Sequence, residues 1–161
     1  MLSEEKISLA EEYFERAFQS QLDGEIDEAI DDYKTSIKFY ATAKAHTFLG
    51  HAYSLKGEYE SAISECKKAI TLNPEYGDSY YDIGIYLLNL GFPNRAISWF
   101  EKAACANDYE PKHFPFYNLG KIYEKKYEWL KAIEYYNKAL ILNQDYEPAQ
   151  NAVIKMATLL N

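Results

Sequence analysis

A pair of residues, Ala-Ile, recurs along the chain at nearly constant spacing. The four pairs begin at Ala29, Ala62, Ala96 and Ala132, which gives successive spacings of 33, 34 and 36 residues. A glycine stands five residues before each of the first three pairs, and a Leu-Gly or Ile-Gly pair recurs with the same period. Interlocking patterns of one period indicate a structural repeat, so the 161 residues are expected to form a stack of about four similar units.

Each period holds two stretches with the spacing of an amphipathic helix. Apolar or small residues follow that spacing over residues 43–56, and Gly57 ends the stretch because glycine adopts the left-handed conformation without steric cost. A second helical stretch, residues 59–72, ends at Asn73-Pro74, since proline cannot continue a helix. No segment shows the period-two alternation of a strand over a useful length, which predicts an all-α fold of helical hairpins.

Three glycines lie in the middle of predicted helices, at Gly50, Gly84 and Gly120. A glycine there costs about 1 kcal/mol relative to alanine, so its recurrence indicates a close helix crossing. We expect the partner helix to cross at its small residue, which is Ala62, Ala96 or Ala132. One hairpin cannot bury both of its faces, so neighbouring hairpins are expected to stack into a solenoid.

The repeated pattern resembles the tetratricopeptide repeat, in which an aromatic residue, Leu-Gly, Tyr, Ala, a second aromatic residue and Pro follow at fixed spacing. Repeat two has His46, Leu49-Gly50, Tyr53, Ala62, Cys66 and Pro74; repeat three has Tyr80, Ile83-Gly84, Leu87, Ala96 and Phe100; repeat four has Phe116, Leu119-Gly120, Tyr123, Ala132 and Tyr136. Repeat one is degenerate, with Tyr13, Ala29 and Tyr33. The resemblance implies a right-handed superhelical solenoid of four helix-turn-helix hairpins, at about 10–42, 43–76, 77–112 and 113–146, and a capping helix over 147–161, within a single domain of residues 1–161.

Two positions depart from the family pattern. The segment Asp108–Pro115 carries two extra residues and two prolines, which predicts a longer connection between repeats three and four. Tyr127 occupies the place of the turn glycine, so either a non-glycine residue adopts a positive φ there or the turn takes another form.

The charge of the chain argues against two classes of partner. Lys and Arg number 17 against 25 Asp and Glu, a net charge of -8, which repels nucleic acid and anionic membrane surfaces. The start shows no basic and apolar signal segment, and no stretch is long and apolar enough to span a bilayer, so we expect a cytoplasmic protein. Cys66 and Cys105 lie in helical apolar patterns and are interpreted as reduced, buried thiols.

The sequence contains no motif of a known type of catalytic site. It has no GxSxG, no glycine-rich phosphate loop and no recurring set of metal-ligand spacings. Asp78 and Asp82, one helical turn apart, could approach a cation, but no third ligand accompanies them. We therefore expect no enzymatic activity, no cofactor and no metal site.

The resemblance implies that the first helix of each hairpin lines a concave groove. The groove is expected to contain Phe14, Phe18, Lys44, Thr47, His51, Asp78, Tyr81, Asp82, Ile85, Phe114, Tyr117, Asn118 and Lys121, with Leu22, Phe48, Leu88 and Lys125 beside them. Aromatic rings with a polar end are typical of binding hot spots. The leading hypothesis is therefore an adaptor that binds a peptide segment of another protein in this groove. The alternative is that Phe14, Phe18 and Phe114 only complete the core.

Two other functions remain open. Ile154, Ala157 and Leu159 widen the apolar face of the terminal helix, which favours a self-associating scaffold, such as a homodimer through this end. A co-chaperone or secretion-type chaperone is the other alternative, but without the carboxylate clamp that the family uses for acidic peptide tails. The matching clamp positions hold Phe14, Phe18, Phe48, Asp78 and Asp82, and the two acidic residues would repel such a tail.

Overall fold

The computed structural model describes residues 2–160, and helices are the only regular secondary structure in that range. Met1 and Asn161, which the expected domain and terminal helix include, lie outside the described residues. The helices are α1 (Leu2–Leu22), α2 (Ile26–Phe39), α3 (Ala43–Leu55), α4 (Tyr59–Leu72), α5 (Gly77–Asn89), α6 (Pro93–Cys105), α7 (His113–Lys125), α8 (Trp129–Leu142) and α9 (Glu147–Leu160). The all-α class predicted from the sequence is confirmed.

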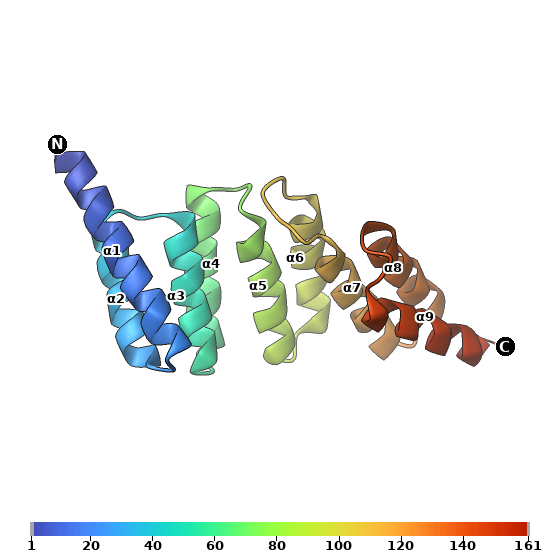
Figure 1. The fold of residues 1–161 in the computed structure, drawn as a ribbon. Coiled ribbons are helices and arrows are strands. Elements are labelled where there is room, and N and C mark those ends of the chain that lie inside the picture. Colours follow the sequence, from blue (N-terminus) through green and yellow to red (C-terminus); the bar gives the residue numbers. More distant parts are fainter. Residues whose placement is uncertain (1, 161) are drawn as a thin grey trace.

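Successive helices pair into four hairpins, and the hairpins stack in chain order. The pairs are α1 with α2, α3 with α4, α5 with α6, and α7 with α8, and α9 packs on α8 at the end of the row. Figure 1 shows an elongated stack in which the odd-numbered helices lie on the near side. Because α3 also contacts α5 directly, these two helices lie on the inner side of the stack at this step. The fold is the helical repeat solenoid that the sequence predicted.

The turn inside each hairpin uses one residue in the left-handed conformation. Gly24, Gly57 and Gly91 have φ values of 84°, 78° and 81°, and Tyr127 takes the same place with φ 61°. Of the two forms expected at Tyr127, the structure therefore has the positive φ. The mechanism of the turn is conserved among the hairpins even where glycine is absent.

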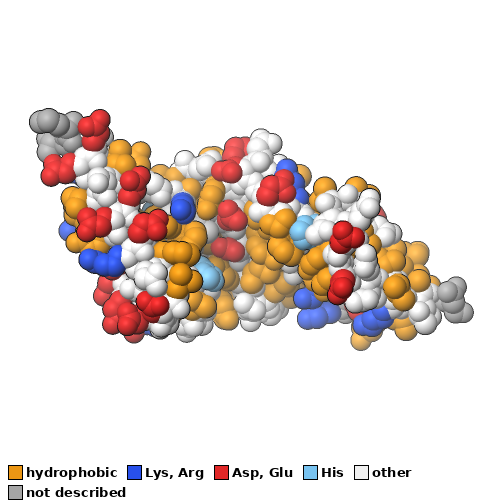
Figure 2. All heavy atoms as spheres, in the orientation of Figure 1, with side chains coloured by type: hydrophobic (Ala, Val, Ile, Leu, Met, Phe, Trp, Pro, Cys, Tyr) orange, Lys and Arg blue, Asp and Glu red, His pale blue; other side chains and the backbone are white. Residues whose placement is uncertain are grey.

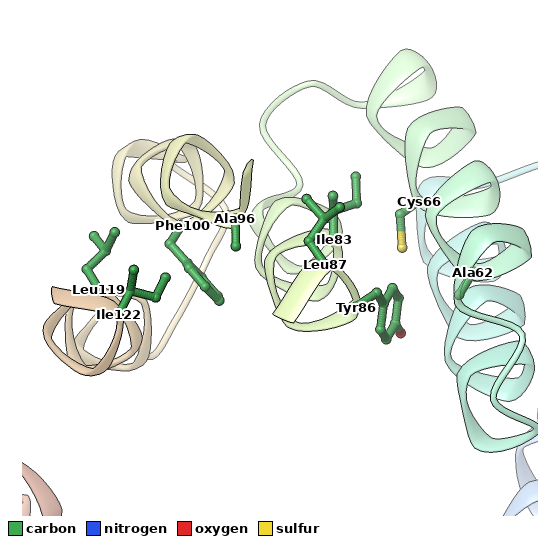
Figure 3. Close-up of a cluster of buried hydrophobic side chains, with 9 residues drawn as sticks. All are labelled: Ala62, Cys66, Ile83, Tyr86, Leu87, Ala96, Phe100, Leu119 and Ile122. Atoms are coloured by element: carbon green, nitrogen blue, oxygen red, sulfur yellow. The ribbon is translucent and has the colours of Figure 1, made fainter. Parts of the chain in front are cut away.

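Side chains from adjacent hairpins interlock in the core between them. Figure 3 shows Ala62 and Cys66 of α4 directed toward α5, and Phe100 of α6 beside Ile122 of α7. All four side chains are buried. Each hairpin interface thus joins one repeat to the next, as a solenoid requires.

The mid-helix glycines do mark close crossings, but the contacting residue differs from that expected at two of them. A Cβ atom on Gly50 would lie 3.0 Å from the Ala62 carbonyl oxygen, as predicted. At Gly84 it would lie 2.6 Å from the ring of Phe100, and at Gly120 it would lie 2.6 Å from the ring of Tyr136. The nearest atoms there belong to an aromatic side chain four residues after the expected alanine, because these repeats have a large ring where repeat two has a cysteine.

The two thiols differ in their surroundings. Cys66 is fully buried, as predicted, and burial raises its pKa above the usual range. Cys105 is exposed, so the prediction that it is buried is wrong. It is the last residue of α6, and the equivalent positions Thr71 and Ile141 are exposed as well, so this position faces away from the core in each repeat. Within residues 2–160, no helix is both long and apolar enough to cross a membrane.

Candidate functional site: the groove along the odd-numbered helices

Two hollows lie on the face formed by the odd-numbered helices. The first, between α1 and α3, has a volume of about 450 Å³, and Phe14, Tyr40 and Lys44 are among the residues that line it. The second, which we call the acidic hollow, lies between α3 and α5 and has a volume of about 410 Å³. It is lined by Thr47, Phe48, His51, Tyr76, Asp78 and Asp82. Figure 2 looks onto this face and shows acidic atoms in its middle, close to a patch of histidine atoms.

The predicted groove residues differ in how much of each side chain reaches the surface. Lys44, His51 and Lys121 are exposed, whereas Phe18, Asp78, Tyr81, Asp82, Ile85, Phe114 and Tyr117 are half-buried. Phe14, Thr47 and Asn118 are buried. Phe14 and Thr47 nevertheless line the first hollow and the acidic hollow, and a binding role for these three residues stays a prediction.

Phe14 illustrates the alternative in which groove aromatics complete the core. Its ring lies 5.4 Å from that of Tyr33 and 5.2 Å from that of Phe48, and it belongs to the core cluster of the first two repeats. Phe18 and Phe114 remain half-buried and keep part of their surface on the groove side. Lys44 lies over the Phe14 ring at 4.5 Å, so a cation covers the face that Phe14 presents to the first hollow.

Tyr81 is a fixed part of the groove wall. Its ring stacks on Tyr109 at 5.7 Å and contacts Phe100 at 5.6 Å. The amide of Asn118 donates a hydrogen bond to the Tyr81 hydroxyl at 3.1 Å and a second one to the Phe114 carbonyl oxygen at 3.0 Å. Asn118 thus holds Tyr81 and the start of α7 in place, which is why its own side chain is buried.

Tyr76 and Tyr109 are not among the residues predicted from the sequence, and both lie in connections between hairpins. The segment 106–112 folds back on the connection between α4 and α5, where the Gly77 amide donates to the Asp108 carbonyl oxygen at 3.0 Å. Tyr109 is buried against Gly77. A Cβ atom added to Gly77 would lie only 2.2 Å from the Cβ atom of Tyr109. The long connection is confirmed, although Pro115 already belongs to α7. A glycine at a helix start and an aromatic residue in the inserted segment were the available signals.

The acidic hollow holds two carboxyl groups that have no cation beside them. Burial raises the pKa of Asp82 to about 7, and the negative charge of Asp78 adds to this effect. Burial likewise raises the pKa of Asp78, as does Asp108, while a hydrogen bond from Tyr76 opposes the shift. Among the ion pairs of residues 2–160, none involves Asp78 or Asp82.

The lysines of the groove lie on aromatic rings to either side of the acidic hollow. Lys44 is 4.5 Å from the ring centre of Phe14, and Lys121 is 5.5 Å from that of Tyr117. One lysine thus lies on either side of the acidic hollow, although Glu11 and Glu15 line the first hollow beside Lys44. No group of three His, Cys, Asp or Glu side chains within residues 2–160 is arranged to hold a metal ion.

Comparison with known proteins places this geometry in a family. Two family models described as tetratricopeptide repeat match residues 43–76 and 114–146. Anaphase-promoting complex subunit 3 of Schizosaccharomyces pombe is 30% identical over 118 residues, which are 73% of this chain and 17% of that protein. The chain thus spans less than a fifth of this relative's length.

Solved structures share the arrangement of the helices. The crystal structure of MamA has 26% sequence identity and a TM-score of 0.76, over 84% of this chain and 78% of that one. PilF of Pseudomonas aeruginosa has 18% identity and a TM-score of 0.83, over 94% of this chain and 68% of that one. The periodic residues, the stacked hairpins and the two model matches together show that the chain belongs to the tetratricopeptide repeat family.

Proposed function

We propose that this chain is a non-enzymatic adaptor that binds a peptide segment of another protein along the odd-numbered helices. The observation that carries the proposal is the pair of hollows on this face, each lined by aromatic rings beside charged groups. Rigid aromatic rings bind with little loss of conformational entropy, and charged groups in a concave surface select the partner. The similarity to a subunit of the anaphase-promoting complex, a multi-protein assembly by its name, supports a role in protein interaction.

The proposal is tested by site-specific photo-crosslinking in the source cell. A photoreactive amino acid is placed at His51 or Lys121 in the groove, and at Glu60 or Lys102 on the even-numbered helices as matched controls. All four side chains are exposed, so the substitutions leave the core intact. Tyr81 and Tyr117 are less suitable, because both pack against core rings.

We expect one partner protein to be crosslinked from both groove positions and from neither control position. A partner crosslinked only from Glu60 or Lys102 would show that binding uses the opposite face. That result would refute peptide binding along the odd-numbered helices, but it would not affect the fold.

Self-association through the C-terminal end is a second candidate, because that end is strongly apolar. Ile154 and Leu159 are 65% and 56% exposed, and Ala157 is exposed on the same helix. A hollow of about 420 Å³ at this end of the stack is lined by residues that include Leu130 of α8 and Leu160 of α9. Ile154 stands 34 residues after Gly120, so the two residues hold equivalent positions in α9 and α7. At Gly120 the second helix of the hairpin packs closely, whereas α9 has an isoleucine at this position.

Light scattering over a dilution series tests this second candidate. We expect a dimer that dissociates on dilution and that the substitution Ile154→Glu converts into a monomer. A monomer at every concentration would exclude self-association and leave the adaptor proposal as the only one of the two.

A further inference from the structure

The acidic hollow differs from every other enclosed carboxylate site of the described chain in lacking a cation. Glu65 is buried, but His46 Nδ1 lies 2.7 Å from one of its oxygens and Lys68 Nζ lies 2.6 Å from the other. Glu124 is half-buried, and Lys155 Nζ lies 2.7 Å from its carboxylate. Asp78 and Asp82 have no such partner among residues 2–160, and the charged groups that act on them are themselves acidic.

The lack of a cation beside Asp82 destabilises the ionised form of its carboxyl group. Asp82 is half-buried where it lines the hollow, and this burial is the main cause of its raised pKa. An enclosed carboxylate is destabilising unless a cation or several hydrogen-bond donors compensate it. No ion pair of residues 2–160 involves Asp82, so a basic side chain of a ligand would supply the missing compensation.

The other walls of the hollow suit the side chain of a cation. Tyr76 before α5 contributes an aromatic ring, which attracts a guanidinium or ammonium group and covers its aliphatic stem. Phe48 of α3 contributes a second ring, and Lys44 lies 5.9 Å from its centre. Lys121 already lies over the Tyr117 ring beyond α5, which disfavours a further basic residue of a ligand on that side. The acidic hollow therefore favours a basic side chain of the bound segment at this point of the groove.

We propose that the acidic hollow receives an arginine or lysine side chain of the bound peptide segment, which Asp78 and Asp82 hold by charge-assisted hydrogen bonds. This inference rests on the proposed adaptor function and specifies the chemistry of its partner. It also predicts that acidic peptide tails are rejected at the same place, because they would meet two carboxylates.

The test selects ligands from a displayed library of random 12-residue peptides on the full chain. The strongest peptide is then titrated as selected and with its basic residue replaced by citrulline, which has nearly the same shape as arginine and no charge. Both peptides are titrated against the wild-type chain and the double variant Asp78→Asn/Asp82→Asn. The control variant, Asp31→Asn/Glu60→Gln, removes the same charge from exposed positions on even-numbered helices.

We expect selected peptides to share a basic residue, and the citrulline peptide to bind the wild-type chain at least tenfold more weakly. In the Asp78→Asn/Asp82→Asn variant the two peptides should bind equally, whereas the control variant should keep the full difference. Peptides that lack a basic residue and bind the double variant as well as the wild type would overturn the inference, while adaptor function would stand if they still crosslink to His51. Failure to obtain any peptide that crosslinks to His51 or Lys121 would overturn the adaptor function and the inference with it.

Discussion

The substitution Gly84→Ala tests the helix crossing that fixes the spacing of the stack. The added methyl group would lie 2.6 Å from Cε1 and 2.8 Å from Cδ1 of Phe100, whereas carbon atoms pack best at about 3.5–4.0 Å. Phe100 is fully buried and contacts Tyr81, so its ring cannot move aside without displacing other side chains. The overlap of about 1 Å must therefore be absorbed by α5, α6 or both.

Two opposing effects determine the expected magnitude. Alanine improves helix propensity by about 1 kcal/mol, while overpacking a rigid core costs about 2–3 kcal/mol when several ring atoms overlap. We expect the free energy of unfolding to fall by about 1–2 kcal/mol, or about 3–6 °C in Tm for a chain of this size. Urea unfolding followed by circular dichroism measures this difference.

A double-mutant cycle separates the overlap from other effects. Phe100→Leu alone opens a cavity, but in the Gly84→Ala background it also makes room for the methyl group, so the two losses should be less than additive by about 1 kcal/mol. Gly91→Ala is the control, since it has φ 81° and no atom within 4 Å of the added methyl; its loss of about 1 kcal/mol should be additive with Phe100→Leu. Wild-type stability of Gly84→Ala, or strict additivity with Phe100→Leu, would refute the close crossing.

Three further predictions concern a turn, a charge and the thiols. Tyr127→Gly should raise the free energy of unfolding by about 1 kcal/mol, because the tyrosine holds φ 61° with an exposed side chain; unchanged or lower stability in urea unfolding would contradict this. Asp82→Asn should raise the free energy of unfolding by about 1–2 kcal/mol at pH 8. The pKa of Asp82 is raised from 3.8 to about 7 in the folded chain, so its ionisation opposes folding increasingly as the pH rises from 4 through 7. The gain should vanish near pH 3.5, and a gain independent of pH would contradict the reasoning. Maleimide should label Cys105 rapidly in the native chain and Cys66 only on unfolding, as peptide mass spectrometry would show, since only Cys105 is exposed; rapid labelling of Cys66 would contradict its burial.

The hairpins and their order could be predicted because each repeat carries the same local signals. Gly57 and Asn73-Pro74 end helices through properties of the backbone, which act in the same way in any context. The period of the small residues then determines which helices meet. The place of Tyr127 in the turn could also be predicted, but its conformation could not, because a positive φ and another form of turn were both open.

The detailed contacts could not be predicted in the same way. Tyr109 lies in an insertion that has no counterpart in the other repeats, and its burial against Gly77 depends on how the segment 106–112 folds back. Whether a groove ring such as Phe14 is free or part of the core depends on its neighbours in the adjacent helix. The absence of a cation near Asp82 is likewise a property of the assembled stack, because it depends on where every lysine of the neighbouring helices points.

Paramagnetic relaxation in solution tests the groove most directly. The library-selected peptide carries a nitroxide label at one end, and the amide signals of the full chain are recorded with the label oxidised and reduced. Binding along the odd-numbered helices predicts strong broadening at His51 and Asp82 on α3 and α5, and little at Glu60 and Lys102 on α4 and α6. Broadening centred on Glu60, Lys102 or the exposed face of α9 would contradict the account.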